Sequence, residues 1–180
     1  TEVKTFKIDS PDHLQITDEV LLQAGYDFTG LRESFYHLTE PLYLKAGKCQ
    51  ELLYWDHNTQ FCGVCGSPMR MQTDISKVCT ACGKEVWPQL STAVIVLVYK
   101  GDEVLLVHAR NFKSNFYGLV AGFVETGETL EGAVRREVME ETGLTIKNLR
   151  YIDSQPWPYP CGLMAGYMAE YESGDIRLQR

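Results

Sequence analysis

Apolar residues in the second half of the chain recur in the pattern expected for strands arranged around one helix. Five extended segments are predicted: STAVIVLVY (91–99), EVLLVHA (103–109), FYGLVAGFV (116–124), and stretches near 145–154 and 162–171. The third leads through ETGET (125–129) into a helical segment that ends before Gly143. Strand, strand, strand, helix, strand, strand predicts an α/β fold with a mixed sheet and a helix on its face.

The first part of the chain is less informative. Residues 1–60 carry no chemical signature, although PLYLKAGKCQELLYWDHNTQ (41–60) has a helical pattern. Its expected packing residues are Leu42, Leu52, Leu53 and Trp55. Residues 61–88 are rich in Gly and Cys and predict a compact insert. The expected organisation is an N-terminal region (1–60), the insert (61–88) and a larger α/β domain (89–180).

Charge and composition limit the classes of function. The 180 residues have a formal net charge of −7, which argues against a broad basic surface for nucleic acid. No run of about 18 apolar residues is present, so no membrane-spanning helix is predicted. The polar start TEVKTFKIDS is unlike a signal peptide, and a cytoplasmic protein without membrane association is expected. An anionic ligand would need local help from a metal ion, a helix N-terminus or clustered arginines.

Four of the six cysteines form two C-x-x-C pairs, each followed by glycine. The pairs lie in FCGVCG (61–66) and VCTACG (78–83), with 13 residues between Cys65 and Cys79. Cys62, Cys65, Cys79 and Cys82 therefore predict one tetrahedral Zn²⁺ per chain, structural because four sulfurs leave no open position for chemistry. A disulfide pair and a redox role are the alternatives. Cys49 and Cys161 lie outside the pattern and are expected to be ordinary free thiols.

The segment REVMEETGL (136–144) places three glutamates within five positions of one helix. At 100° per residue, an arc of roughly 120° contains six side chains: Leu130, Ala133, Val134, Glu137, Glu140 and Glu141. Arg135, Arg136 and Met139 take the outer arc. Inward carboxylates need compensation, and Mg²⁺ or Mn²⁺ supplies it because hard cations prefer oxygen ligands. The alternative is a solvated acidic surface.

The loop before this helix has features of a phosphate site. GFVETGE (122–128) offers Gly122 and Gly127 for close backbone approach, and Thr129 is a candidate N-cap. A strand, a glycine loop and a helix that carries metal-binding carboxylates suit phosphate chemistry, because metal ions neutralise phosphoryl oxygens and lower the pKa of an attacking water.

Gly122, five residues, Glu128, seven residues and Arg136–Leu144 together fill every fixed position of the 23-residue Nudix box. This resemblance implies a Nudix α/β/α sandwich that hydrolyses a nucleoside diphosphate linked to another moiety. It also implies that Glu137, Glu140 and Glu141 bind the catalytic metals together with the carbonyl of Ala121. Arg136 and Glu128 would orient the helix and loop through an internal ion pair.

A second motif, SQPWPYP (154–160), follows the box. Alternating prolines favour an extended backbone, on which Trp157 and Tyr159 would project to one side. This aromatic pair could stack on a base or a nicotinamide ring, with Gln155 bonding to ring edges. An ordered turn packed on the core is the alternative. A proline-rich ligand for partner domains would usually show P-x-x-P instead.

The run SQPWPYPCGLMAGY (154–167) resembles the specificity array of NADH pyrophosphatases, a Nudix family that also carries a four-cysteine zinc ribbon. The resemblance implies cleavage of NAD(H) to nicotinamide mononucleotide and AMP by a homodimer. It places in the nucleotide site Gln155, Pro156, Trp157, Pro158, Tyr159, Pro160, Cys161 and Gly162. Phe123 would stack on a ring. Trp87 matches a substrate-contacting position, with a core role as its alternative.

Three departures from the family pattern qualify this expectation. Tyr159 stands where Phe is usual, and Gly162 stands where Ser is usual. Family members also continue past the position of Arg180 with a further metal-binding glutamate, a strand and a helix. The sandwich is therefore expected to be truncated or completed differently, which leaves activity of this chain open.

Two other functions compete with NADH hydrolysis. One is removal of NAD caps from RNA 5′ ends by the same chemistry, with a local basic patch near Arg110, Lys113 and Arg135. The other is a non-catalytic module that binds a nucleotide without cleaving it.

Overall fold

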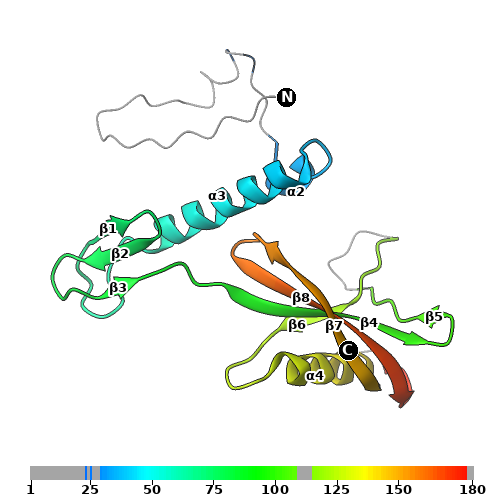
Figure 1. Ribbon diagram of the computed structural model, residues 1–180. Helices are drawn as coiled ribbons and strands as arrows, with labels where there is room; N and C mark the ends of the chain where they lie inside the picture. Colours follow the sequence, from blue (N-terminus) through cyan, green and yellow to red (C-terminus); the bar gives the residue numbers. More distant parts are fainter. Residues whose placement is uncertain (1–22, 24, 26–28, 109–114, 178–180) are drawn as a thin grey trace. The chain divides into compact units, whose positions relative to one another are not determined.

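The computed structural model describes residues 23, 25, 29–108 and 115–177 (Figure 1). The chain divides into two compact units between Cys49 and Gln50. The short helix α2 (Leu31–Ser34) precedes the long helix α3 (Glu40–Asn58), as the pattern of 41–60 predicts. None of the helices in the described residues combines the length and apolarity that a membrane crossing needs.

The packing predicted for α3 is only partly right. Trp55 is buried, and Leu42 and Leu52 are half-buried. Leu53, however, is 69% exposed, so its predicted packing role is wrong. Leu53 and Trp55 are two positions apart and therefore point in different directions on a helix.

The Gly- and Cys-rich insert forms a small antiparallel sheet in the order β1-β2-β3. Its strands are β1 (Met69–Thr73), β2 (Ser76–Cys79) and β3 (Glu85–Val86). Met69 pairs with Cys79 across β1 and β2. One cysteine pair therefore precedes β1, and the other spans the end of β2 and the turn to β3.

The second sheet is mixed, as predicted. It contains β4 (Ser91–Lys100), β5 (Glu103–Val104), β6 (Val120–Phe123), β7 (Thr145–Trp157) and β8 (Gly162–Ser173). The order is β5-β4-β8-β7, and β6 also pairs with β4. The β4–β8 pair is parallel, and the other pairs are antiparallel.

Two of the predicted strands are shorter than the apolar pattern suggests. Of the described residues 103–108, only Glu103–Val104 form a strand with β4. Val107 instead bridges to Gly118, which draws this segment away from the ladder. The extended piece 116–124 contributes only Val120–Phe123.

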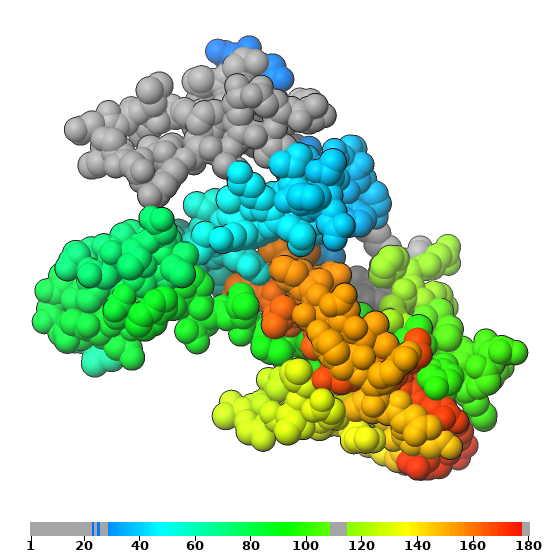
Figure 2. Space-filling view, in the orientation of Figure 1, coloured from blue at the N-terminus to red at the C-terminus, as the bar shows by residue number. Residues whose placement is uncertain are grey.

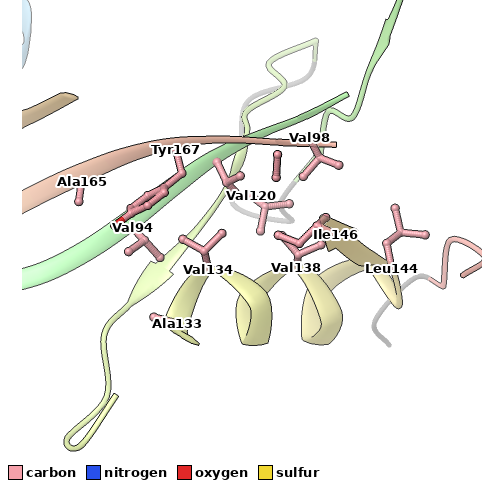
Figure 3. Close-up of a cluster of buried hydrophobic side chains, with 12 residues drawn as sticks. Val94, Val98, Val120, Ala133, Val134, Val138, Leu144, Ile146, Ala165 and Tyr167 are labelled. Carbon is pink, nitrogen blue, oxygen red and sulfur yellow. The ribbon is translucent and has the colours of Figure 1, made fainter. Parts of the chain in front are cut away.

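Helix α4 (Leu130–Thr142) packs on one face of the mixed sheet (Figure 3). In the close-up, Val134 and Val138 point from the helix toward side chains of the sheet. Alternate residues of β4 and β8 face the helix, which fits the period of two along a strand. The buried cluster is Val94, Val96, Val98, Val120, Ala133, Val134, Val138, Leu144, Ile146, Ala165, Tyr167 and Ala169.

The ends of α4 form where the local sequence predicts them. The Thr129 hydroxyl accepts a hydrogen bond from the Gly132 amide at 3.0 Å. At the other end, Gly143 adopts a φ of 76° and its amide donates to Met139 O. The carboxylate-bearing turns of α4 are thus held at both ends.

Candidate active site and zinc centre

The four sulfurs of Cys62, Cys65, Cys79 and Cys82 lie within 4.8 Å of one another. The separations are 3.7 Å for Cys62–Cys82 and 3.5 Å for Cys65–Cys79. A tetrahedron with Zn–S bonds of about 2.3 Å has sulfurs about 3.8 Å apart, so the cluster fits zinc. The same separations are far too long for disulfide bonds, which excludes that alternative.

Backbone amides point at the same sulfurs, as the glycine-flanked pairs require. Val64 N lies 3.4 Å from Cys62 Sγ, and Ala81 N lies 3.4 Å from Cys79 Sγ. Hydrogen bonding from the backbone and side chain of Ser67 helps lower the pKa of Cys65 to about 6. Such donors stabilise thiolates, the form that binds a metal. The donor set therefore suits a closed, structural zinc site.

Arg136, in the middle of α4, is the centre of a charged network. Its Nε donates to Glu128 Oε1 at 2.7 Å and its Nη2 to Glu128 Oε2 at 2.9 Å, a two-pronged pair. Its Nη1 donates to Glu137 at 2.8 Å and to Glu140 at 3.0 Å. The hydrogen bond from Arg136 lowers the pKa of Glu128 to about 2, and Glu128 in turn raises the pKa of Arg136. The pair fixes the glycine loop against the helix.

The helical-wheel prediction is partly wrong. Val138 and Thr142 are buried, so the inward face of α4 is rotated toward them. Glu140, expected to point inward, has a side chain that is 52% exposed. Arg136, expected on the outer arc, is only 21% exposed because the loop residue Glu128 draws it in. The ideal wheel omits this loop contact.

Glu137 lies directly against the backbone of β6. A Cβ atom added to Gly122 would overlap the Glu137 carboxylate, so only glycine leaves room for this approach. Glu137 is 13% exposed. Burial, followed by the charge of Glu137, raises the pKa of the neighbouring Glu141. Two glutamates thus lie close together in a partly desolvated place.

The alternation of the backbone directs the Ala121 carbonyl to the edge of β6 that faces away from β4. Val124 N donates to Thr92 O at 3.0 Å, so every second residue of this segment bonds to β4. Ala121 and Phe123 consequently direct their backbone groups toward the opposite edge. Arg136 Nη2 donates to Phe123 O at 2.9 Å on that edge. The Ala121 carbonyl therefore lies on the edge of β6 that Arg136 of α4 also reaches. Among the described residues, the oxygens of Glu137, Glu140 and Glu141 do not form a cluster within 4.8 Å as the four cysteine sulfurs do.

A pocket of about 380 Å³ adjoins this edge. Ala121, Gly122 and Phe123 of β6 form part of its wall. The turn between β7 and β8 forms another part through Trp157, Tyr159, Pro160, Cys161 and Gly162. The Trp157 and Tyr159 rings are in edge-to-face contact, with centroids 5.3 Å apart. The pocket and the Glu137 carboxylate thus share strand β6 but lie on opposite faces of it, because the side chains of Ala121 and Phe123 alternate with Gly122.

Family models match both parts of this arrangement. Residues 57–86 match the NADH pyrophosphatase zinc ribbon domain, and residues 89–174 match the NUDIX domain. The chain contains a Nudix domain preceded by a zinc ribbon domain. The predicted fold class, a Nudix fold preceded by a zinc ribbon, is confirmed.

Curated relatives are similar to this chain over most of its length. A protein named NAD-capped RNA hydrolase NudC from Salmonella schwarzengrund is 45% identical over 136 residues, which is 75% of this chain and 53% of the relative. Its namesake from Pectobacterium atrosepticum is 44% identical over 137 residues, 76% of this chain and 53% of that relative. The Nudix chain spans about half the length of these relatives.

A solved structure supports the Nudix fold alone. The Nudix hydrolase from Nitrosomonas europaea has a TM-score of 0.52 and 23% sequence identity, and it covers 65% of this chain and 70% of that one.

The structure brings together only part of the predicted nucleotide site. Five of the eight residues predicted between Gln155 and Gly162 line the pocket, together with Phe123. Gln155 and Pro156 are exposed in β7, Pro158 is buried, and Trp87 is 50% exposed, and none of these four lines the pocket. The orange atoms of β7 lie at the surface in Figure 2, consistent with its place at the edge of the sheet.

The predicted extended geometry of the array is wrong beyond Trp157. Strand β7 ends there and a turn follows, because the chain reverses to pair Trp157 with Gly162 of β8. Prolines 156 and 158 fit this arrangement, since an edge strand and a turn both tolerate the missing amide.

Among the pocket residues that the sequence prediction did not name, Tyr54 is the aromatic one. Tyr54 of α3 lines the pocket together with the Nudix residues. No motif signals it, because it lies 67 positions before Ala121 in a segment whose pattern indicates only a helix.

Proposed function

We propose that this chain hydrolyses the diphosphate bond of NAD(H), yielding nicotinamide mononucleotide and AMP. The observation that supports it most is the shared strand β6. The Glu137 carboxylate lies against Gly122, while Ala121, Gly122 and Phe123 wall the aromatic pocket. A dinucleotide with one ring in this pocket would pass its diphosphate around the edge of β6 to the carboxylates on the other face.

The oxygen donors of the α4 glutamates have the chemistry that a hard divalent cation prefers. Glu137, Glu140 and Glu141 offer carboxylate oxygens, and Ala121 offers a carbonyl directed to the same edge. The raised pKa of Glu141 reflects a partly buried charge beside another charge, which a cation would relieve. We assign these four groups as ligands of Mg²⁺ or Mn²⁺, which when bound neutralises phosphoryl oxygens and lowers the pKa of water.

The other residues position the substrate and the carboxylates. Arg136 and Glu128 hold the glycine loop on α4 through their two-pronged ion pair. Phe123, Trp157 and Tyr159 supply flat apolar surfaces to one base, and Cys161, Gly162 and Pro160 complete that wall. At about 380 Å³ the pocket is at the small end of ligand sites, which fits one half of a dinucleotide. We propose Gln155, Pro156, Pro158 and Trp87 as substrate contacts only for the half of the dinucleotide that lies outside the pocket.

Removal of NAD caps from RNA is the second candidate, favoured by the names of the curated relatives. The chemistry at the diphosphate would be the same. The predicted basic patch lends little support: Arg110 and Lys113 lie outside the described residues, and Arg135 Nη1 donates to Ile146 O at 2.8 Å. Turnover of NADH should therefore be compared with turnover of NAD-capped RNA under identical conditions.

The organisation around this site is also part of the proposal. We assign residues 61–88 to the zinc ribbon and residues 89–180 to catalysis, with residues 1–60 as a separate N-terminal region. We further propose a cytoplasmic homodimer. Light scattering on the purified chain tests the dimer, and a monomer at working concentration would reject it.

The deciding experiment is incubation with NADH and Mn²⁺ or Mg²⁺, followed by identification of the products. Nicotinamide mononucleotide and AMP in equal amounts are expected, and Glu141→Gln serves as the inactive control. NADH binding without any product would reject the hydrolase and favour the non-catalytic nucleotide-binding module.

A further inference from the structure

Tyr54 adds an aromatic wall to the pocket from outside the Nudix domain. It lies in the last turns of α3, it is 41% exposed, and it lines the same pocket as Phe123 and Trp157. The Trp157 ring already contacts Tyr159 edge-on. A base that enters the pocket therefore meets a further flat ring at Tyr54. Aromatic side chains bind bases of any sequence through stacking on their π-faces.

The position of Tyr54 depends on how the end of α3 is held. Lys77 of the zinc ribbon is 3% exposed and reaches the C-terminal end of that helix. Its Nζ donates to Asp56 O at 2.8 Å and to Thr59 O at 2.9 Å, and it lies 2.7 Å from Asp56 Oδ1. An ammonium has three N–H donors, and these three oxygens match them.

This contact is a C-terminal cap supplied by a distant part of the chain. The last carbonyls of a helix have no partner within the helix, and they favour a cation because of the helix dipole. Trp55, also buried, lies with its ring 5.6 Å from Lys77 Nζ and shields the contact. A desolvated lysine with all its donors used is costly to remove, since its partners would then lack hydrogen bonds.

The zinc cluster fixes Lys77 in turn. Lys77 lies in β2, two residues before the zinc ligand Cys79, and its strand is paired on both sides, with Met71 and with Val86. A continuous physical path therefore runs from the four sulfurs through Lys77 to the end of α3 and to Tyr54.

We propose that Tyr54 is a specificity-determining residue that stacks on one base of the dinucleotide, and that Lys77 is the positioning residue by which the zinc ribbon holds it there. This inference rests on the proposed function and adds a role for the ribbon: zinc is needed for selective binding of a dinucleotide as well as for stability of the ribbon.

The test compares steady-state kinetics with NADH and with dimethyl diphosphate, which has no base. Tyr54→Ala should raise KM for NADH about fivefold, the effect of losing a contact worth about 1 kcal/mol. Tyr54→Phe keeps the ring and should stay within about twofold of the wild type. The loss should appear in KM for NADH rather than in kcat, and not with dimethyl diphosphate.

Lys77→Met should raise KM for NADH in the same direction. In the Tyr54→Ala background it should add nothing, because both changes remove one contact. Leu53→Ala, at an exposed neighbour on α3, and Lys84→Met, at an exposed ribbon lysine, are the matched controls. If Lys77→Met does not fold with one zinc per chain, Asp56→Asn weakens the same cap at a half-exposed position and should raise KM more mildly.

A binding measurement separates this inference from the proposed function. The Kd for NADH is measured by calorimetry without added divalent metal, where hydrolysis plays no part. A weaker Kd for Tyr54→Ala than for Leu53→Ala supports the inference even if the wild type hydrolyses nothing. Equal Kd values for the wild type and Tyr54→Ala would overturn it even if hydrolysis is fast. Additive effects of Lys77→Met and Tyr54→Ala would overturn the positioning role.

Discussion

Gly122→Ala is the sharpest test of how the candidate site is built. The added Cβ would overlap the carboxylate carbon and both oxygens of Glu137. Carbon atoms in contact prefer about 3.5–4.0 Å, so the Glu137 carboxylate must move by more than about 1 Å. Misplacement on this scale can reduce a reaction about 100-fold, equivalent to about 2.7 kcal/mol in the activation free energy.

Stability should change much less than activity in this variant. Gly122 does not have a left-handed backbone conformation, so alanine brings no backbone strain there. The clash is with the end of a flexible side chain, which can rotate toward solvent. We expect the free energy of unfolding to change by less than about 1 kcal/mol. Gly63→Ala, where an added Cβ meets open space, is the matched control.

The assay is NADH turnover at saturating substrate and Mn²⁺, with thermal melting measured in parallel. Glu137→Asp withdraws the carboxylate by one methylene, so Gly122→Ala should cost less in the Glu137→Asp background than in the wild type. The reasoning is refuted if Gly122→Ala alone keeps kcat within twofold of the wild type while it folds normally.

Three further predictions follow from the same geometry. Glu141→Gln should reduce kcat about 100- to 1000-fold. Without metal, this variant should melt no lower than the wild type at neutral pH, because burial raises the pKa of Glu141, and a clearly lower melting temperature would contradict this. Glu128→Gln should lower the melting temperature at neutral pH. The lowered pKa of Glu128 means that this difference shrinks as pH falls from about 4.3 toward 2, and a pH-independent difference would reject the Arg136 pair as its cause. Cys65→Ser should abolish the single bound zinc in a metal analysis and lower the melting temperature, whereas full retention of zinc would reject the ligand set.

Features encoded within a few residues of one another were predictable. Thr129 and Gly143 mark the ends of α4 because capping is decided by side chains and backbone angles at those positions. The two cysteine pairs identify the zinc ribbon because metal ligands require a fixed spacing. The Glu128–Arg136 pair, implied by the family motif, is present because the loop and the first turns of α4 are adjacent in sequence.

Features that depend on long-range contacts were not predictable from local patterns. The wheel placed Arg136 on the outer arc, but it could not include the hydrogen bond from Arg136 to Phe123 O of β6, 13 positions earlier. The turn after Trp157 is required by pairing of β7 with β8, whereas the prolines alone suggested continued extension. Tyr54 reaches the pocket only through the folded arrangement of distant segments.

The sequence by itself determined the kinds of chemistry available to this protein: four thiols spaced for zinc, and glutamates, a glycine loop and aromatic residues spaced for a Nudix site. These kinds of chemistry follow from the types of residue and from their short spacings along the chain. The tertiary structure alone decided which groups meet, since strand pairing and side-chain packing join residues far apart in the chain. It placed Glu137 on Gly122, rotated the buried face of α4 toward Val138, and joined Lys77 to the end of α3.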